Sequence, residues 1–168
     1  RCNMSELVKE SPWVPLNLHP RLANTVEDID RNIDSALQRT YIPFLELLNK
    51  KRGAVSVVGS GPSLKKNWKR MKDMGHEIIA CNAACQFLLE REVVPQYMFC
   101  FDADPLMLEF LTPHPDITYL MGSRCPPQAF EILKGCKVVI WHAGGDENIE
   151  QLLNKHNKME PMVSGGTA

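Results

Sequence analysis

The chain has 168 residues, of which 44% are hydrophobic and 23% charged, and its formal net charge is -1. This length allows one α/β domain with a substantial core. The balanced charge provides no basic field, which argues against nucleic acid or an anionic lipid surface as a partner. No apolar run reaches the roughly 20 residues that a membrane-spanning helix needs, so we expect no membrane span.

The cysteine pattern indicates reduced thiols and not a metal site. No Cys-x-x-Cys motif occurs, so the closely spaced ligand pairs of a zinc site are missing. Small thiols pack well in or beside buried strands, where several of these cysteines fall. We therefore expect a cytoplasmic protein whose cysteines are reduced: Cys2, Cys81, Cys85, Cys100, Cys125 and Cys136.

The first part of the chain predicts an irregular arm followed by a long helix. Residues 1–24 contain three well-separated prolines, which favour an irregular arm. Thr25 and Asp28 have the spacing of a capped helix start. Apolar residues then recur at helical spacing as far as Lys51, so the pattern predicts a helix over 25–52 that Pro43 kinks or divides.

From residue 54 onward, short apolar runs alternate with helical segments. This alternation predicts an α/β fold: a Rossmann-like, mostly parallel sheet with helices on both faces, preceded by the long helix. We expect residues 25–168 to form one domain, truncated at its C-terminal end after a glycine-rich turn. The expected strands are 54–58, 77–80, 97–101, 117–120 and 138–141, and the expected helices are 64–73, 83–92, 105–111, 126–134 and 146–156.

The first strand of this series leads into a glycine turn. Gly59 and Gly61 are followed by Pro62 and Ser63, which suit the first positions of a helix. A strand, a glycine turn and a helix N-terminus together present backbone N–H groups to an anion, so the turn is a candidate phosphate cradle. A third glycine of the dinucleotide-binding motif is absent, since Leu64 stands there, and an ordinary βα turn remains the alternative.

Each later strand also ends in a polar or glycine-rich stretch. In doubly wound sheets, ligands bind outside the carboxyl ends of the strands. We therefore expect these stretches to meet at one edge of the sheet. They are Gly59-Ser60-Gly61, Asn82, Asp102-Ala103-Asp104, Ser123-Arg124, His142 to Asp146, and Ser164-Gly165-Gly166-Thr167.

Four motifs in this order resemble the MptE-like family. They are Gly-Ser-Gly-Pro-Ser-Leu, Ile-Ile-Ala-Cys-Asn-Ala-Ala, Val-Pro-Gln-Tyr and Ser-Gly-Gly-Thr, spread over residues 54–168. The family includes archaeal 6-hydroxymethyl-7,8-dihydropterin pyrophosphokinases and Maf motility accessory factors implicated in flagellin glycosylation. The first motif and the Cys-Asn pair also resemble bacterial sialyltransferases that use CMP-sialic acid.

The resemblance implies a Rossmann-like nucleotide-binding fold and transfer from a nucleotide-activated or phosphorylated donor. It further implies that the first glycine turn contacts the donor's phosphates or ribose, that Asn82 contacts the nucleotide, and that the last glycine turn lies beside it. The implied positions are Gly59, Ser60, Gly61, Ser63, Asn82, Gly165, Gly166 and Thr167. The family continues beyond its Ser-Gly-Gly turn, and the catalytic histidine of the sialyltransferases has no assured counterpart in this chain.

Two acidic residues are candidate ligands of a metal ion. Asp102 and Asp104 flank one alanine at a strand end, a spacing that lets two carboxylates share Mg²⁺ or Mn²⁺ bridging a diphosphate. Asp102 is also a candidate catalytic residue. The structural alternative is that Asp104 caps the following helix while Asp102 supports the turn. We expect no organic cofactor.

Two further stretches offer chemistry at strand ends. His142 with Asp146 is a candidate general base with its orienting partner, although a histidine in a turn beside glycines is an equally ordinary structural residue. Ser123 and Arg124 are candidates for clamping a phosphate or carboxylate.

These observations leave three functions open. The first is a transferase that takes a nucleotide-activated donor, with sugar transfer favoured by the resemblance. The second is Mg²⁺-dependent transfer of diphosphate from ATP to 6-hydroxymethyl-7,8-dihydropterin, for which the Asp102 and Asp104 pair is the distinguishing feature. The third is a non-catalytic nucleotide- or sugar-binding module. The acceptor is not specified by any of these features.

Overall fold

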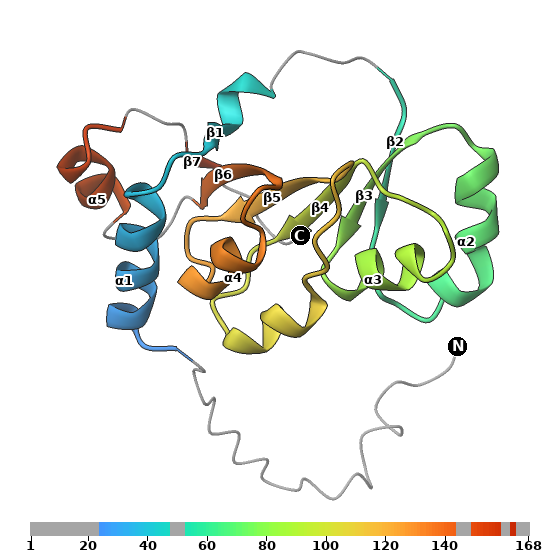
Figure 1. Cartoon of the computed structure of the whole chain (residues 1–168), viewed down its shortest axis with the longest axis horizontal. Helices are drawn as coiled ribbons and strands as arrows, with labels where there is room; N and C mark the ends of the chain where they lie inside the picture. Colours follow the sequence, from blue (N-terminus) through green and yellow to red (C-terminus); the bar gives the residue numbers. More distant parts are fainter. Residues whose placement is uncertain (1–23, 48–52, 144–148, 159–161, 164–168) are drawn as a thin grey trace, which may run out of the picture.

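The computed structural model describes residues 24–47, 53–143, 149–158 and 162–163 (Figure 1). The expected arm over 1–24 lies outside the described residues except for Asn24. None of the described helices is long and apolar enough to cross a membrane.

A parallel sheet forms the centre of the fold and confirms the expected α/β class. Six strands follow the spatial order β1-β6-β5-β4-β3-β2, each neighbouring pair is parallel, and β7 adds to β6 in parallel. The strands are β1 (Ile42–Pro43), β2 (Val55–Val58), β3 (Glu77–Cys81), β4 (Tyr97–Cys100), β5 (Thr118–Gly122), β6 (Lys137–Ala143) and β7 (Met162–Val163).

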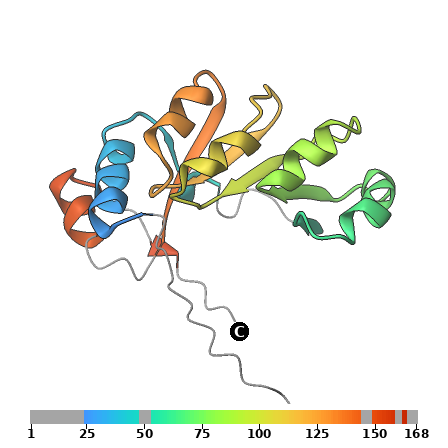
Figure 2. The same ribbon diagram turned by 90° about the horizontal axis from the view of Figure 1, so that it is seen from below.

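The connections between successive strands pack on one face of the sheet. From β2 to β6 the chain moves to the next position each time, and right-handed crossovers then place every connection on the same side. Figure 2 shows α3, η2 and α4 above the sheet in this way. The helices are α1 (Val26–Leu37), η1 (Phe44–Glu46), α2 (Leu64–Asp73), α3 (Ala83–Leu89), η2 (Pro105–Phe110), α4 (Pro127–Ile132) and α5 (Ile149–Lys155).

The two faces of the sheet are covered unequally. The connected face carries the larger core cluster, in which strand residues such as Met98 and Tyr119 pack against buried residues of α2, α3, η2 and α4. The opposite face carries a smaller cluster around Val139 and Trp141, against which residues of β1 and η1 pack. Toward β2 this face is open, and Val57 is 71% exposed.

The first helix is shorter than the predicted 25–52. A reciprocal capping box between Thr25 and Asp28 starts α1 as expected, but the helix ends at Leu37. Ile42 and Pro43 then form β1, which pairs with β6 at the outer position of the main sheet. A residue before proline favours extended backbone, and an edge strand tolerates the missing N–H, so the proline ends the helical pattern instead of kinking it.

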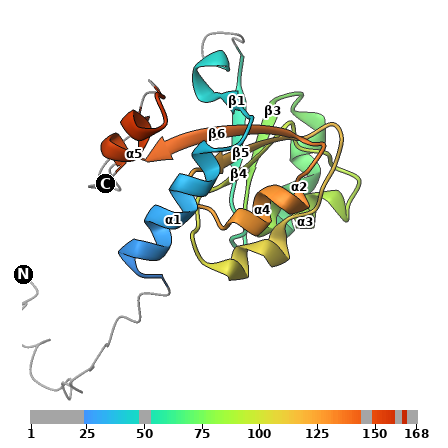
Figure 3. The ribbon, with the colours of Figure 1, turned by 60° about the vertical axis from the view of Figure 1, so that its left-hand side comes forward.

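α1 and α5 lie side by side, next to the side of the sheet that β1 and β6 form (Figures 1 and 3). Ile33 and Leu37 of α1 bury against Ile149 and Leu153 of α5. Asp34 of α1 accepts hydrogen bonds from Lys155 and from the His156 imidazole, the latter at 2.9 Å. These bonds lower the pKa of the Asp34 carboxyl to about 2.

Candidate functional site

The carboxyl ends of the parallel strands meet at one edge of the sheet, as the sequence predicts. The register pairs Val58 with Ala80, Cys81 with Phe99, and Cys100 with Met121. The residues that follow β2, β3, β4 and β5 therefore share this edge, which we call the carboxyl edge. They include Gly59, Asn82, Asp102 and Arg124.

A pocket of about 440 Å³ opens at the carboxyl edge between the ends of β3, β4 and β5. It contains three of the predicted site residues, Asn82, Asp102 and Arg124, which lie up to 42 positions apart in the sequence. The amide, the carboxylate and the guanidinium together offer donors and acceptors to one small ligand. The lining residues are Cys81, Asn82, Phe99, Phe101, Asp102, Ala103 and Arg124.

Asn82 holds a strained backbone conformation between β3 and α3. Its φ is 48° and its ψ is -126°, and its N–H donates to the Phe99 carbonyl oxygen at 3.2 Å. The residue occupies the position before α3, but its exposed side chain makes no capping hydrogen bond. Such a conformation costs about 1–3 kcal/mol and is concentrated at functional sites. The amide of Asn82 is therefore available to a ligand in the pocket.

Asp102 and Asp104 each accept a backbone hydrogen bond. The Asp104 N–H donates to Asp102 Oδ1 at 3.0 Å, and the Leu106 N–H donates to Asp104 Oδ1 at 2.9 Å. The hydrogen bond to Asp104 caps η2, as the structural alternative predicted. Only Asp102 lines the pocket.

The two carboxylates fit a metal ion only together with a ligand. Among the described residues, no group of three or more His, Cys, Asp or Glu side chains is arranged to hold one. Mg²⁺ commonly takes one or two protein carboxylates and completes its shell with phosphate oxygens and water. Asp102 and Asp104 do not form an all-protein metal site, so an ion held by them would need oxygen ligands from a bound phosphate and from water.

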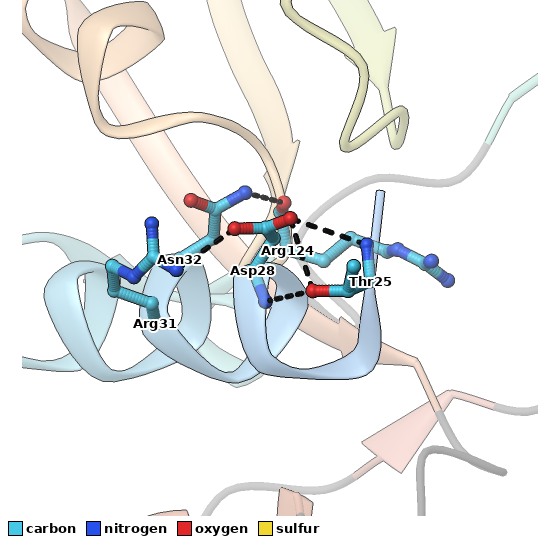
Figure 4. A network of polar contacts seen from close by, with 5 residues as sticks. All are labelled: Thr25, Asp28, Arg31, Asn32 and Arg124. Atoms are coloured by element: carbon cyan, nitrogen blue, oxygen red, sulfur yellow. Dashed lines mark hydrogen bonds and ion pairs between the residues drawn. The ribbon is translucent and has the colours of Figure 1, made fainter. Parts of the chain in front are cut away.

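Arg124 is positioned by α1. The Asn32 side-chain amide donates to the Arg124 carbonyl oxygen at 3.0 Å, and the Arg124 side chain extends away from Asn32 (Figure 4). Its guanidinium lies over the Phe101 ring, 4.9 Å from the ring centroid. Arg124 Nε is buried and has no hydrogen-bond partner among the described residues. A buried donor without a partner costs free energy, so an anionic ligand would relieve it.

An aromatic wall, formed by Phe99, Phe101 and Trp141, supports the pocket. Both phenylalanine rings stack on Trp141 with centroid distances of 4.9 Å. The stack crosses β5 at Gly122, where a Cβ would lie 2.8 Å from Phe101 Cδ2. Sequence reasoning missed this wall. Its signal was the spacing of Phe99 in β4 and Phe101 directly after it, because residues two apart in extended chain point to the same side.

The glycine turn after β2 lies at the carboxyl edge but does not line the pocket. Gly59, Ser60, Gly61 and Ser63 are exposed, and a Cβ on either glycine would meet nothing within 4 Å. The expected serine cap is wrong. Ser63 occupies the position before α2, but it has helical backbone angles and its side chain makes no capping hydrogen bond.

Two predicted residues are buried and do not line this pocket. Ser123 is 3% exposed and lines a small neighbouring space, which Phe101 and Arg124 also line. His142 is 0% exposed within β6, where it pairs in register with Met162 of β7. The prediction that His142 lies in a turn is wrong, since the residue lies within β6. Its burial argues against the general-base role, because a base must reach the reacting proton. The proposed partner Asp146, and Gly165, Gly166 and Thr167, lie outside the described residues.

Cys81 lines the pocket without acting as a strong nucleophile. Burial raises the pKa of its thiol, so the thiolate is scarce at neutral pH. The described cysteines, Cys81, Cys85, Cys100, Cys125 and Cys136, are free thiols, as expected, and Cys2 is outside the described residues.

Comparisons with known proteins identify the family. A solved structure, the MAf glycosyltransferase from Magnetospirillum magneticum AMB-1, shares 15% sequence identity with the chain, with a TM-score of 0.49 over 71% of this chain and 20% of that one. The chain thus spans about a fifth of that protein's length. No curated protein matches the chain. The family model described as 6-hydroxymethylpterin diphosphokinase MptE-like matches residues 27–168, so the chain belongs to the MptE-like family and the resemblance is confirmed.

Proposed function

We propose that the chain is a transferase domain that holds a nucleotide-activated donor in the pocket at the carboxyl edge, with a nucleotide sugar as the donor. One observation carries the proposal. Asn82, Asp102 and Arg124 surround a single pocket of about 440 Å³, and Arg124 Nε has no partner there among the described residues. Membership of the MptE-like family, whose description names a diphosphate-transferring enzyme, supports the transferase class.

Each lining residue has a role that follows from its chemistry. The Arg124 guanidinium binds the donor's phosphate through charge-assisted hydrogen bonds. The side-chain amide of Asn82 binds the ribose or a phosphate, and the aromatic wall gives the ligand an apolar surface. The exposed turn over Gly59, Ser60, Gly61 and Ser63 provides backbone N–H groups to a phosphate that extends beyond the pocket. Ser123 is buried and does not line the pocket, so we assign it no direct contact with the donor.

Asp102 supplies the acid–base chemistry. Its exposed carboxylate accepts the proton of the acceptor hydroxyl as that oxygen attacks the anomeric carbon of the sugar. The bond to the nucleotide phosphate breaks, and the nucleotide leaves with the bonding electrons. Arg124 then stabilises the negative charge on the departing phosphate. Mg²⁺ or Mn²⁺ at Asp102 would add to that stabilisation.

A second candidate is the transfer of diphosphate from ATP to a hydroxymethylpterin. The family description names this activity, and the Asp102 and Asp104 carboxylates each engage only one oxygen with a backbone N–H. In this candidate function the other oxygens would hold a metal ion that also binds the phosphates of ATP. In this reaction the pterin hydroxyl attacks the β-phosphorus and AMP leaves.

A thermal-shift panel distinguishes these functions. The ligands are CMP, a CMP-sugar, a UDP-sugar, ATP and GTP, each with and without Mg²⁺. A ligand present at 100 times its Kd stabilises the folded chain by about 2.7 kcal/mol, which raises Tm measurably. We expect a nucleotide sugar to raise Tm without metal. A rise in Tm with ATP that requires Mg²⁺ would favour diphosphate transfer.

Arg124→Gln should reduce the shift clearly at the same ligand concentration. The matched control is Lys66→Gln, which removes an exposed cation of α2 and should leave the shift unchanged. An equal loss in both variants, or no shift with any nucleotide, would contradict donor binding at this pocket. Asp102→Asn separates catalysis from binding, since it should keep the thermal shift and lose turnover. A wild-type chain that binds donor and turns over no acceptor or water would indicate the non-catalytic binding module.

A further inference from the structure

A second pocket lies at the opposite end of the sheet from the proposed donor site. β6 begins at Lys137 and ends at Ala143, and β1 is parallel to it, so the residues that precede both strands share one edge. There a pocket of about 600 Å³ is bounded by the connection from α1 to β1, the end of α4 and the start of β6. A volume in this range accommodates a small organic ligand.

Cationic side chains dominate the rim of this pocket. Arg39, Lys134 and Lys137 line it, and Glu131 is the one carboxylate among the lining residues. Arg39 Nη1 is paired with Glu131 Oε1 at 2.7 Å, which leaves the charges of the two lysines uncompensated by another lining side chain. Lys158 lies near the same rim, with its ammonium 4.7 Å from the centroid of the Tyr41 ring. The local charge is positive although that of the whole chain is -1.

The backbone acceptors at the end of α4 are already used. The Lys134 N–H donates to the Glu131 carbonyl oxygen at 3.2 Å, and the Cys136 N–H donates to the Leu133 carbonyl oxygen at 2.9 Å. These carbonyls therefore offer little to a cation. Arg39 Nε, in contrast, is buried and has no hydrogen-bond partner among the described residues, so a donor at this rim lacks an acceptor.

The floor of the pocket is apolar. Phe130, Leu133 and Ile140 line it and are at most 7% exposed. The guanidinium of Arg39 lies 5.3 Å from the centroid of the Phe130 ring. Gly135, with a φ of +89°, turns the chain out of α4, and a Cβ there would meet nothing within 4 Å, so the mouth is open on that side.

We propose that this pocket is a second binding site, for a small organic anion that combines a phosphate or carboxylate with a planar apolar body. The anion contacts the Lys134 and Lys137 ammonium groups, while the planar body lies on the apolar floor of the pocket. The site is separate from the donor pocket and does not depend on the proposed transferase activity.

Binding of phenyl phosphate, followed by NMR titration of the full chain at low salt, tests this proposal. We expect saturable shifts of the Lys134, Gly135 and Lys137 amides, and no saturable shift with benzyl alcohol, which has the ring without the charge. The double variant K134Q/K137Q should weaken binding by about tenfold, since each partly exposed charge contact contributes a factor of up to about 5. Added salt should weaken binding of the wild-type chain because the cations are exposed.

The double variant K66Q/K69Q, which removes the same charge from exposed positions on α2, is the matched control and should bind as the wild type does. All four lysines are exposed, so both double variants should fold, and unchanged Tm values check this. The proposal is overturned if benzyl alcohol binds as well as phenyl phosphate, if K134Q/K137Q binds with wild-type affinity, or if both double variants weaken binding equally. Absence of saturable binding to the wild-type chain overturns it as well.

Discussion

Arg124 and Arg39 occupy opposite ends of the same sheet and share one packing arrangement with different partners. Each guanidinium lies over a phenylalanine ring, at 4.9 Å from Phe101 and at 5.3 Å from Phe130, and each has a buried Nε without a hydrogen-bond partner among the described residues. Arg39 is paired with Glu131, whereas Arg124 has no ion-pair partner among the described residues. The same geometry therefore gives a neutralised structural pair at one end and an uncompensated cation at the other.

The comparison shows that an arginine stacked on an aromatic ring does not by itself indicate a binding site. What distinguishes the carboxyl edge is that Arg124 lines a pocket together with Asn82, whose backbone is strained, and the exposed carboxylate of Asp102. At the other edge, the charge available to a ligand comes from lysines and not from the paired guanidinium. Substitutions at one edge should therefore leave the other edge intact.

The largest effect is expected for Gly122→Val. A Cβ at this position would lie 2.8 Å from Phe101 Cδ2, so the stack of Phe101 on Trp141 has to move. Overpacking of this kind costs about 1–3 kcal/mol in the free energy of unfolding, measured by urea denaturation. The displaced Phe101 should also move Arg124 and remove donor binding.

Gly59→Ala is the matched control for that substitution, because its Cβ would meet nothing within 4 Å. Its stability should stay within about 0.5 kcal/mol of the wild type. If Gly122→Val is as stable as Gly59→Ala, the aromatic wall does not constrain β5 as described.

The two arginines should separate binding from stability. Arg124→Gln should weaken donor binding by about ten- to a hundredfold, since a hydrogen bond to a charged group contributes about 1.5–3 kcal/mol. Arg39→Gln should leave donor binding unchanged and lower the free energy of unfolding by about 1 kcal/mol, because the ion pair with Glu131 is partly exposed. Isothermal titration calorimetry and urea denaturation of both variants check this. Equal donor affinities would remove the distinction between the two ends.

Substitutions of Asn82 test whether its strain serves the site. Asn82→Gly should keep or raise stability, because glycine adopts a φ of 48° readily, whereas Asn82→Ala should lose about 1 kcal/mol. Both variants should bind donor more weakly, since both lack the amide. If the glycine variant binds donor as tightly as the wild type, donor affinity follows stability and the role of Asn82 is purely structural.

The smallest effect concerns acid stability at the contact between α1 and α5. The Asp34 pKa lies below its ordinary value of about 4 because Lys155 and His156 hydrogen-bond the carboxylate. The stabilisation is therefore complete above about pH 4 and is lost as the pH falls toward about 2. Asp34→Asn should flatten the loss of stability in this window, with a change of at most about 1 kcal/mol at neutral pH. An unchanged acid unfolding curve would show that the contact between α1 and α5 does not depend on this charge.

Local patterns were sufficient to predict most of the fold. Strand and helix alternation from residue 54 predicted the parallel sheet, and strand-end polarity predicted that Asn82, Asp102 and Arg124 share one edge. The end of α1 was not predictable in this way, because apolar residues of β1 happen to continue the helical spacing. Their pairing with β6, nearly 100 residues away, decides their conformation.

The site was predicted less completely because burial and backbone strain are tertiary properties. Nothing local distinguishes the fully buried His142 from an exposed strand-end base; its position in β6 beside β7 buries it. The positive φ of Asn82 and the aromatic wall across Gly122 likewise depend on three neighbouring strands. Sequence reasoning therefore identifies the edge and the residue types, while the packing selects which of them face the ligand.

The most direct measurement is an NMR titration of the chain with the nucleotide that gives the largest thermal shift. The account predicts saturable changes at the amides of Asn82, Asp102 and Arg124, at lower nucleotide concentrations than any changes at the Lys134 and Lys137 amides. Changes centred on the opposite end of the sheet, or none at the carboxyl edge, would contradict the placement of the donor.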